Sequence, residues 1–210
     1  MALLFSTTIQ TREDEGLKAM FVARKRVFID LLHWDIPALD GKYEIDGFDD
    51  EHAHYLILTD RNGAHLASAR LLPTTQPHIL GMLFPELCED GVPIGDTIFE
   101  ITRFCLDRDL TAIERRTARN QLITALVEHA LANGIERYTG VAGMAWLQQI
   151  LGFGWDCRPL GAPVQHASGT IAGLDIHISR ATPALLEAAG IWLPTATPML
   201  HERRAVGANG

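Results

Sequence analysis

Residues 98–106 read IFEITRFCL, an apolar segment on which the predicted sheet depends. Its β-branched and aromatic residues predict a strand, yet Glu100 and Arg103 lie inside it. Opposite charges in so apolar a strand are costly unless they are paired or line a cleft. Residues three apart on a regular strand point to opposite faces. Glu100 and Arg103 can therefore line one cleft only if a bulge intervenes.

The segments around this strand predict a single mixed α/β (α+β) domain. Strands are expected at 54–59, 65–72, 98–106, 135–141 and 170–179, and the first residues form a further strand or an arm. Helices are expected at 11–33, 111–134, 144–151 and from 182, the first and last with Thr11 and Thr182 as N-caps. Helices thus pack on a mostly antiparallel sheet over residues 1–194, and residues 195–210 form a loose tail.

The composition fits one globular domain and excludes several functions. The chain has 210 residues, of which 47% are apolar and 21% charged. A net charge of −8 argues against nucleic-acid binding and against docking on anionic lipid. No apolar run approaches the roughly 20 residues of a membrane helix, and the first residues lack a basic signal region. Three scattered cysteines without a CxxC pair favour neither metal nor disulfide, so we expect a cytoplasmic protein without membrane insertion.

Charged residues in or beside apolar segments are the candidates for chemistry. Taken singly, they have ordinary interpretations: a snorkelling arginine, an edge-strand arginine, a solvated acidic loop at 34–50 or a structural ion pair. A near-balanced set instead suggests a polar cleft built for a zwitterionic ligand. The set comprises Arg24, Arg70, Arg103, Glu44, Asp46, Asp49 and Glu100.

The spacing of these residues resembles that of the LuxI-type acyl-homoserine-lactone synthases, the autoinducer synthases of quorum sensing. The resemblance covers about the first half of the chain, and Thr102 stands where the family usually has serine. The second half matches in outline, through Gly152-Phe153-Gly154-Trp155. The matching pieces are Arg24-x-x-Val27-Phe28, Trp34, Glu44-x-Asp46-x-x-Asp49, Tyr55-Leu56, Arg70-Leu71-Leu72-Pro73-Thr74-Thr75, Phe84 and Glu100-Ile101-Thr102-Arg103-Phe104.

The resemblance implies a fold similar to the GNAT acetyltransferases and a reaction of two substrates. An acyl-acyl carrier protein, or in some members an acyl-CoA, gives its acyl group to the amino nitrogen of S-adenosylmethionine. The methionyl carboxylate then attacks its own γ-carbon, and methylthioadenosine leaves as the lactone closes. S-adenosylmethionine is therefore expected as a substrate, and no cofactor is expected.

The residues suit this chemistry. S-adenosylmethionine needs acids near its cations, an arginine near its carboxylate and aromatic neighbours such as Phe28 and Trp34. The attacking amine must be neutral, and a carboxylate in an apolar strand can have its pKa raised toward working pH. Glu100 is thus the expected base. Arg70 and Arg103 complete the catalytic group, and the substrate-binding set adds Arg24, Glu44, Asp46, Asp49, Phe84 and Thr102.

The acyl chain needs an apolar tunnel, with candidates in 101–106, 122–131 and 141–151. In the family, the oxidation state of the β-carbon depends on a hydroxyl in the strand after the long helix. Thr139 is the one hydroxyl candidate there, and Ala142 is equally the aligned position. The sequence leaves open the length and the oxidation state of the acyl chain. It also leaves open whether the acyl group is aryl or fatty, and whether a carrier protein or CoA delivers it.

Three arginines, Arg115, Arg116 and Arg119, open the long helix. They meet either the phosphopantetheine or an acidic carrier protein, or they form a solvated basic turn.

Two other classes remain open at this point. A plain GNAT-type N-acetyltransferase using acyl-CoA would need a glycine-rich turn before the long helix, and residues 108–120 contain no glycine. A non-enzymatic acyl or nucleoside binding module would be indicated by loss of Glu100 or Arg24, and both are present.

Overall fold

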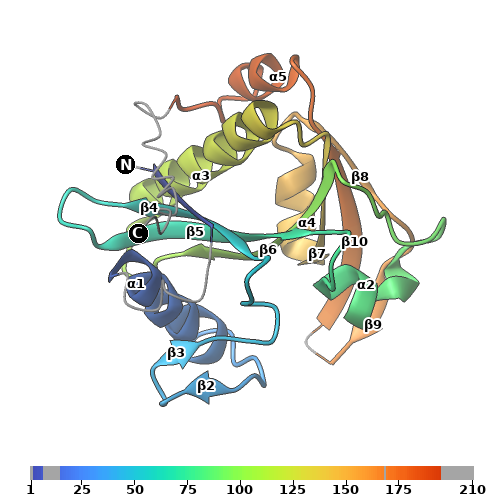
Figure 1. Ribbon diagram of the computed structural model, residues 1–210. Coiled ribbons are helices and arrows are strands. Elements are labelled where there is room, and N and C mark those ends of the chain that lie inside the picture. Colours follow the sequence, from blue (N-terminus) through green and yellow to red (C-terminus); the bar gives the residue numbers. More distant parts are fainter. Residues whose placement is uncertain (1, 7–14, 168, 195–210) are drawn as a thin grey trace, which may run out of the picture.

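A computed structural model describes residues 2–6, 15–167 and 169–194. Its main sheet has the strand order β1-β4-β5-β6-β7-β10-β8, with β9 also paired to β10 (Figure 1). The β6–β7 pair is parallel and the other pairs are antiparallel, which confirms the expected fold class. The strands are β1 (Ala2–Ser6), β4 (His54–Thr59), β5 (His65–Pro73), β6 (Ile98–Leu106), β7 (Arg137–Gly143), β8 (Asp156–Pro159), β9 (Val164–His166) and β10 (Gly169–His177).

Helices cover both faces of this sheet, with α1 and α3 on opposite sides (Figure 1). Strand alternation explains the two layers. Tyr55 and Ile57 pack with Leu17 and Met20 of α1, whereas Leu56 and Leu58 belong to the core under α3. The helices are α1 (Glu15–Arg24), α2 (Ile79–Leu83), α3 (Ala112–Asn133), α4 (Met144–Leu151) and α5 (Thr182–Ala188), with a 3₁₀ turn at Pro85–Leu87.

The first helix ends earlier than expected. It passes at Lys25 into a π-helical turn, Lys25–Ile29, and does not continue to His33. Here Leu32 N donates to Val27 O and Trp34 N donates to Phe28 O, so the chain widens and turns back over itself. The expected Thr11 cap lies outside the described residues. In the loop that follows, β2 (Ala38–Leu39) and β3 (Tyr43–Glu44) pair as a small separate sheet.

Other boundaries also differ. The expected strands, α3 and α4 are present, but β8 and β9 were missed because they are short, polar and largely exposed. Thr182 is not an N-cap: it is the first residue of α5, and its hydroxyl accepts from Ser179 N at 2.9 Å. The expected tail, 195–210, lies outside the described residues.

A β-bulge in β6 allows the side chains of Glu100 and Arg103 to lie on the same face of the sheet. Ser68 pairs with Cys105 and Arg70 with Thr102, so β6 carries one extra residue in this interval. Arg103 adopts φ +49°. After the bulge, Cys105 packs with the α1 layer, and Phe104 packs on the α3 core. The bulge thereby brings Arg103 to the α1 face, where Glu100 and Thr102 also lie.

Strands β6 and β7 pair over only a short distance. Their ladder has three pairs, of which Glu100–Thr139 is the last, although the strands continue to Leu106 and Gly143. The sheet therefore opens beyond this pair.

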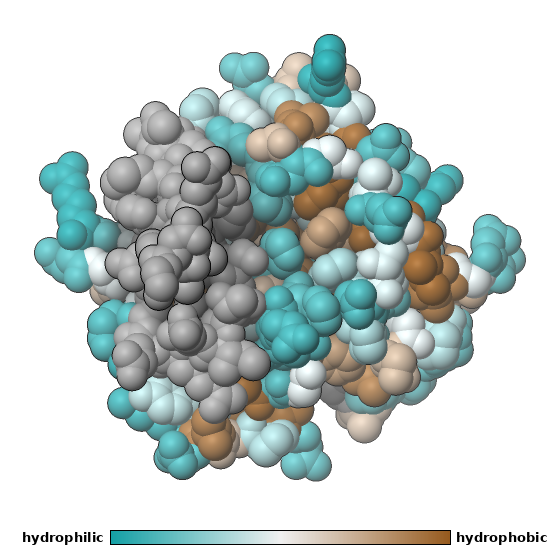
Figure 2. Space-filling view, in the orientation of Figure 1, coloured by the Kyte–Doolittle hydropathy of each residue, from teal (hydrophilic) through white to brown (hydrophobic). Residues whose placement is uncertain are grey.

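Figure 2 shows a mostly hydrophilic face on which apolar side chains form separate groups. No helix in the described part of the chain is long and apolar enough to cross a membrane.

The start of α3 provides a test of local stability. The Thr111 side chain accepts from Glu114 N, and the Glu114 carboxylate accepts from Thr111 N. Thr111→Ala should lower the free energy of unfolding by about 1 kcal/mol, because it leaves a helix N–H without a partner. Urea denaturation would measure this, with exposed Thr117→Ala in the same helix as the control. Equal stability of the two variants would contradict the cap.

Candidate active site

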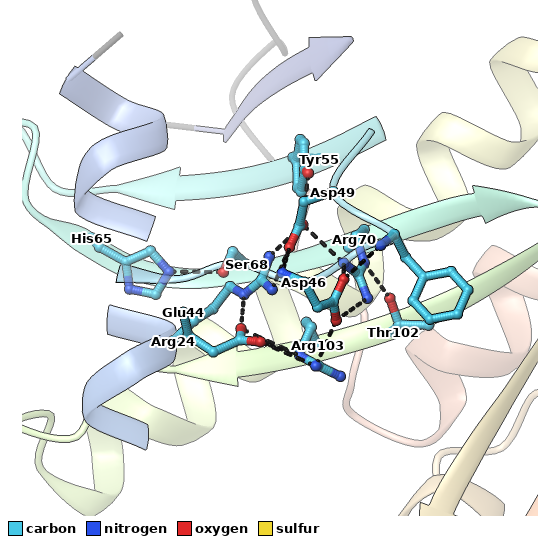
Figure 3. A network of polar contacts seen from close by, with 11 residues as sticks. Arg24, Glu44, Asp46, Asp49, Tyr55, His65, Ser68, Arg70, Thr102 and Arg103 are labelled. Carbon is cyan, nitrogen blue, oxygen red and sulfur yellow. Dashed lines mark hydrogen bonds and ion pairs between the residues drawn. The ribbon is translucent and has the colours of Figure 1, made fainter. Parts of the chain in front are cut away.

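Three arginines and three carboxylates form a closed ring of ion pairs on the α1 face of the sheet (Figure 3). Each arginine contacts two acids, and each acid contacts two arginines. In order around the ring, Arg24 pairs with Asp49 at 2.7 Å, Asp49 with Arg70 at 2.8 Å, Arg70 with Asp46 at 2.6 Å, Asp46 with Arg103 at 2.6 Å, Arg103 with Glu44 at 3.0 Å, and Glu44 with Arg24.

Separate segments of the chain supply this ring. Helix α1 ends in Arg24, β5 and β6 carry Arg70 and Arg103, and the acids come from β3 and the loop after it. The side chains of Arg24, Glu44, Arg70 and Asp49 are at most 1% exposed, whereas that of Asp46 is 18% exposed. The acidic loop is therefore not a solvated one, and Arg24 does not snorkel. Buried charges of this kind are tolerated only when they are paired and hydrogen-bonded.

The ring fixes the ionisation of Asp49. Burial alone would raise the pKa of its carboxyl, but Arg24 and then Arg70 hold that pKa well below its usual range. The Tyr55 hydroxyl donates to Asp49 at 2.7 Å, and burial followed by the Asp49 charge raises the pKa of Tyr55. Sequence reasoning gave Tyr55 no role, because it lies in an apolar strand where a core tyrosine is ordinary.

An aromatic pair adjoins the ring. Phe28 and Trp34 stack with ring centroids 4.7 Å apart, and the guanidinium of Arg103 lies 5.6 Å and 5.4 Å from them. The π-helical turn produces this pair, because it returns the chain over Phe28. The expected grouping of Phe28 and Trp34 with the charged residues is present in the geometry.

A cavity of about 470 Å³ extends from this corner into the opening between β6 and β7. Phe28, Trp34, Thr102 and Arg103 line one end. The rest is largely apolar and includes side chains from the three segments expected for a tunnel. These include Ile101, Phe104, Leu106, Ile123, Leu126, Val141, Ala142, Trp146 and Ile150, joined by Phe153, Trp155, Leu174 and Arg115.

Glu100 lies apart from the ring. It is fully buried, and its Oε1 accepts from Leu80 N of α2 at 3.0 Å. Burial raises its pKa to about 7 despite the opposing effect of the α2 amides, Arg70 and Arg103. No described residue bonds its Oε2. A carboxylate that changes charge near neutral pH, with one oxygen unoccupied, has the properties of a general base.

Several expected site residues lie elsewhere. Thr139 is not among the cavity-lining residues, because β-strand alternation places its side chain on the Glu100 face. Phe84 packs on the edge of His166, with centroids 5.5 Å apart, and does not line the cavity. Arg119 bonds the Asn120 side chain and lies over Phe153, so of the three helix arginines only Arg115 lines the cavity. Arg116 is exposed.

A family model described as autoinducer synthase matches residues 8–183. The chain belongs to the autoinducer synthase family. The activity of this family is acyl-homoserine-lactone synthesis, an acyl transfer that makes a quorum-sensing signal. An acyl-homoserine-lactone synthase of Ralstonia nicotianae is 30% identical over 69% of this chain and 70% of that protein. An isovaleryl-homoserine lactone synthase of Bradyrhizobium diazoefficiens is 31% identical over 78% of this chain and 74% of that protein.

Solved structures agree with this assignment. BjaI, a CoA-dependent acyl-homoserine lactone synthase solved with SAM and isopentyl-CoA, is 28% identical with a TM-score of 0.80, covering 90% of this chain and 89% of that one. An N-acetyltransferase from Lactobacillus plantarum, 15% identical with a TM-score of 0.56 over 85% of this chain and 98% of that one, shares the fold alone. The GNAT-like fold is thus confirmed. Membership of the family favours the synthase over the plain N-acetyltransferase and the non-enzymatic binding module.

The closed ring predicts unequal effects for two neighbouring arginines. Arg24→Ala should lower the free energy of unfolding by about 3–5 kcal/mol, because it leaves two buried carboxylates short of a partner. Arg26→Ala is the control: its pair with Asp109 is 35% and 69% exposed, so the loss should stay below about 1 kcal/mol. Chemical denaturation measures both. Similar losses in the two variants would contradict a stabilising buried ring.

Proposed function

We propose that this chain transfers an acyl group from a thioester to the amino nitrogen of S-adenosylmethionine and closes the product to an acyl-homoserine lactone, releasing methylthioadenosine. One observation carries the proposal: the buried ring, the aromatic pair and the apolar cavity meet at one corner, and the buried carboxylate of Glu100 lies two residues before the cavity-lining Thr102 in β6. Two structures of the relative BjaI, one with SAM and isopentyl-CoA and one with MTA, support it.

The corner offers each part of S-adenosylmethionine a complementary group. Arg103 lines the cavity and can receive the α-carboxylate, while Asp46, the most exposed acid of the ring, offers negative charge to the cations. Phe28 and Trp34 present aromatic faces to the adenine and the sulfonium. The positive charges of the three arginines balance the negative charges of the three acids, so the ring has no net charge. It can therefore bind a ligand that carries charges of both signs.

The acyl transfer needs one proton acceptor. Glu100 takes a proton from the ammonium group, and the neutral amine attacks the thioester carbonyl carbon. The C–S bond of the thioester then breaks, the thiolate leaves with the second amine proton, and an amide remains. In the next step a carboxylate oxygen attacks the γ-carbon, the bond from that carbon to the sulfonium breaks, and methylthioadenosine leaves. Holding the carboxylate near the γ-carbon is the main requirement of this step.

The apolar cavity is our proposed acyl site, with Ala142 in its wall and Arg115 on its lining. A carrier protein and CoA present the same pantetheine arm, so the donor and the chain length are left to the assay. Three free cysteines suit a reducing compartment, and we place the reaction in the cytoplasm, where both substrates are made.

Product analysis tests the function directly. Purified protein would be incubated with S-adenosylmethionine and a panel of acyl-carrier proteins and straight, branched and aryl acyl-CoAs. We expect methylthioadenosine and an N-acyl-homoserine lactone in equal amounts by mass spectrometry. Folded protein that releases no methylthioadenosine with any donor would contradict the proposal.

A second prediction separates chemistry from binding at Glu100. Glu100→Gln keeps size and hydrogen bonding but cannot take a proton, so turnover should fall about 100- to 10,000-fold. Affinity for S-adenosylmethionine, measured by calorimetry, should stay within about tenfold of wild type. Glu187→Gln is the matched control, because Glu187 is exposed on α5, and this variant should change neither quantity. Normal turnover of the Glu100→Gln variant at saturation would exclude Glu100 as the base.

The raised pKa of Glu100 also predicts that the Glu100→Gln variant is more stable than wild type at alkaline pH. The native state holds the Glu100 proton up to about pH 7, whereas the unfolded chain releases it near the ordinary pKa of 4.5. Wild-type stability attributable to this group is therefore lost as pH rises between these values. Glu100→Gln should unfold like wild type below pH 4.5 and be more stable at pH 8, by up to roughly 3 kcal/mol. An inactive variant that is also less stable at pH 8 would contradict this account.

A further inference from the structure

A continuous row of four aromatic side chains lines the apolar cavity. Phe104 contacts Trp146 with ring centroids 5.3 Å apart. Trp146 in turn contacts Phe153, and Phe153 contacts Trp155, each pair with centroids 5.9 Å apart. These separations and the tilted or edge-on ring angles are the ones that aromatic pairs prefer. The aromatic row therefore stabilises its own arrangement.

The first contact of the aromatic row spans the opening between β6 and β7. The two strands separate after the pair Glu100–Thr139. Phe104 lies on β6 beyond that pair, and Trp146 lies in α4, which follows β7 directly. The two rings thus meet across the gap that the separated strands leave. An acyl group that enters this opening has to pack against them.

The other end of the aromatic row is held in place. Phe153 and Trp155 are buried. Trp155 Nε1 donates to Ile150 O at 2.9 Å, and the guanidinium of Arg119 lies 5.0 Å from the Phe153 ring. The indole of Trp146 is therefore confined between this fixed end and Phe104.

The cavity is small for what it has to hold. Its volume of about 470 Å³ falls in the lower half of the roughly 300–1,000 Å³ that is typical of small-molecule sites. Its lining includes Phe28, Trp34 and Arg103, which the proposed function assigns to S-adenosylmethionine. Only part of the volume is therefore left for the acyl group.

We infer that Trp146 determines acyl specificity: its indole admits compact acyl groups, that is, short or branched chains, and excludes long straight chains. A compact group fills the space beside the Phe104–Trp146 contact and packs on the rings. A long chain would have to separate the two rings and would lose their packing energy. The inference rests on the proposed function and names the class of acyl donor that this site takes.

A comparison of acyl donors tests the inference on the wild-type protein. Butanoyl, isovaleryl and dodecanoyl groups would each be offered on CoA and on a carrier protein, with release of methylthioadenosine as the readout. We expect kcat/KM for the dodecanoyl donor to be at least about tenfold below that for the better of the two compact donors, because hydrophobic pockets reject a misfit of even one methylene by roughly 10- to 200-fold.

Removing the indole should reverse this preference. Trp146→Ala should raise kcat/KM for the dodecanoyl donor at least about tenfold and lower it for the isovaleryl donor, while KM for S-adenosylmethionine stays within about twofold. Trp146→Leu removes less volume and keeps the test available if the alanine variant does not fold. Phe104→Leu shortens the other partner of the contact, so it should shift the preference in the same direction.

Trp192→Ala is the matched control. Trp192 is also half-buried and packs on the core under α3, but it is not among the cavity-lining residues. This variant should lose stability without changing the ratio of dodecanoyl to isovaleryl kcat/KM. The comparison separates a change in the acyl site from the general cost of removing an indole from this core.

Three results would overturn the inference. The first is a wild-type preference for the dodecanoyl donor. The second is a ratio of dodecanoyl to isovaleryl kcat/KM that is unchanged in the folded Trp146 variants, or that changes equally in Trp192→Ala. Both leave the proposed function intact, since lactone still forms. The third is folded wild-type protein that releases no methylthioadenosine with any donor, which would overturn the proposed function as well.

Discussion

The buried ring of ion pairs is the constraint on which the site depends. The side chains of Arg24, Glu44, Asp49 and Arg70 are at most 1% exposed, and charges buried in this way are tolerated only when opposite charges pair with them. The acidic loop has little regular structure of its own beyond the short β2–β3 pair. Its position is therefore set by where Arg24, Arg70 and Arg103 converge, and the aromatic pair and the cavity mouth follow from that position.

The convergence depends in turn on one backbone irregularity. On a regular β6, Arg103 would point toward the apolar core under α3, and Glu44 and Asp46 would each lose a partner. The bulge, with Arg103 at φ +49°, moves that side chain to the ring. A left-handed conformation at a non-glycine residue is unfavourable, and the two ion pairs of Arg103 together with its aromatic contacts offset that cost.

Sequence reasoning succeeded where the signal was local and failed where it depended on distant partners. The β4–β5 hairpin, β6 and α3 follow from turn residues, β-branched runs and helical spacing. The charged set was recognisable because charges in apolar segments are anomalous. The π-helical turn was missed because its apolar residues keep helical spacing. Trp146 lies in one of the segments expected for the tunnel, whereas Phe153 was noted only for its place in the family resemblance. Thr139 and Ala142 were equal candidates for the acyl site. Only Ala142 lines the cavity, because the direction of the Thr139 side chain is set by its pairing with Glu100.

The same electrostatics explain why the proposed base, Glu100, lies outside the ring. Asp49 and Glu100 are both buried carboxylates on one face of the sheet, yet their pKa values move in opposite directions. Asp49 is bonded by two guanidiniums, which hold it charged; Glu100 meets mainly backbone amides, and desolvation dominates. An acid bonded like Asp49 cannot accept a proton near neutral pH, so it can only bind and orient. An acid that must take a proton from an amine has to be buried without a guanidinium bonded to it, and Glu100 occupies such a position at the end of the β6–β7 ladder.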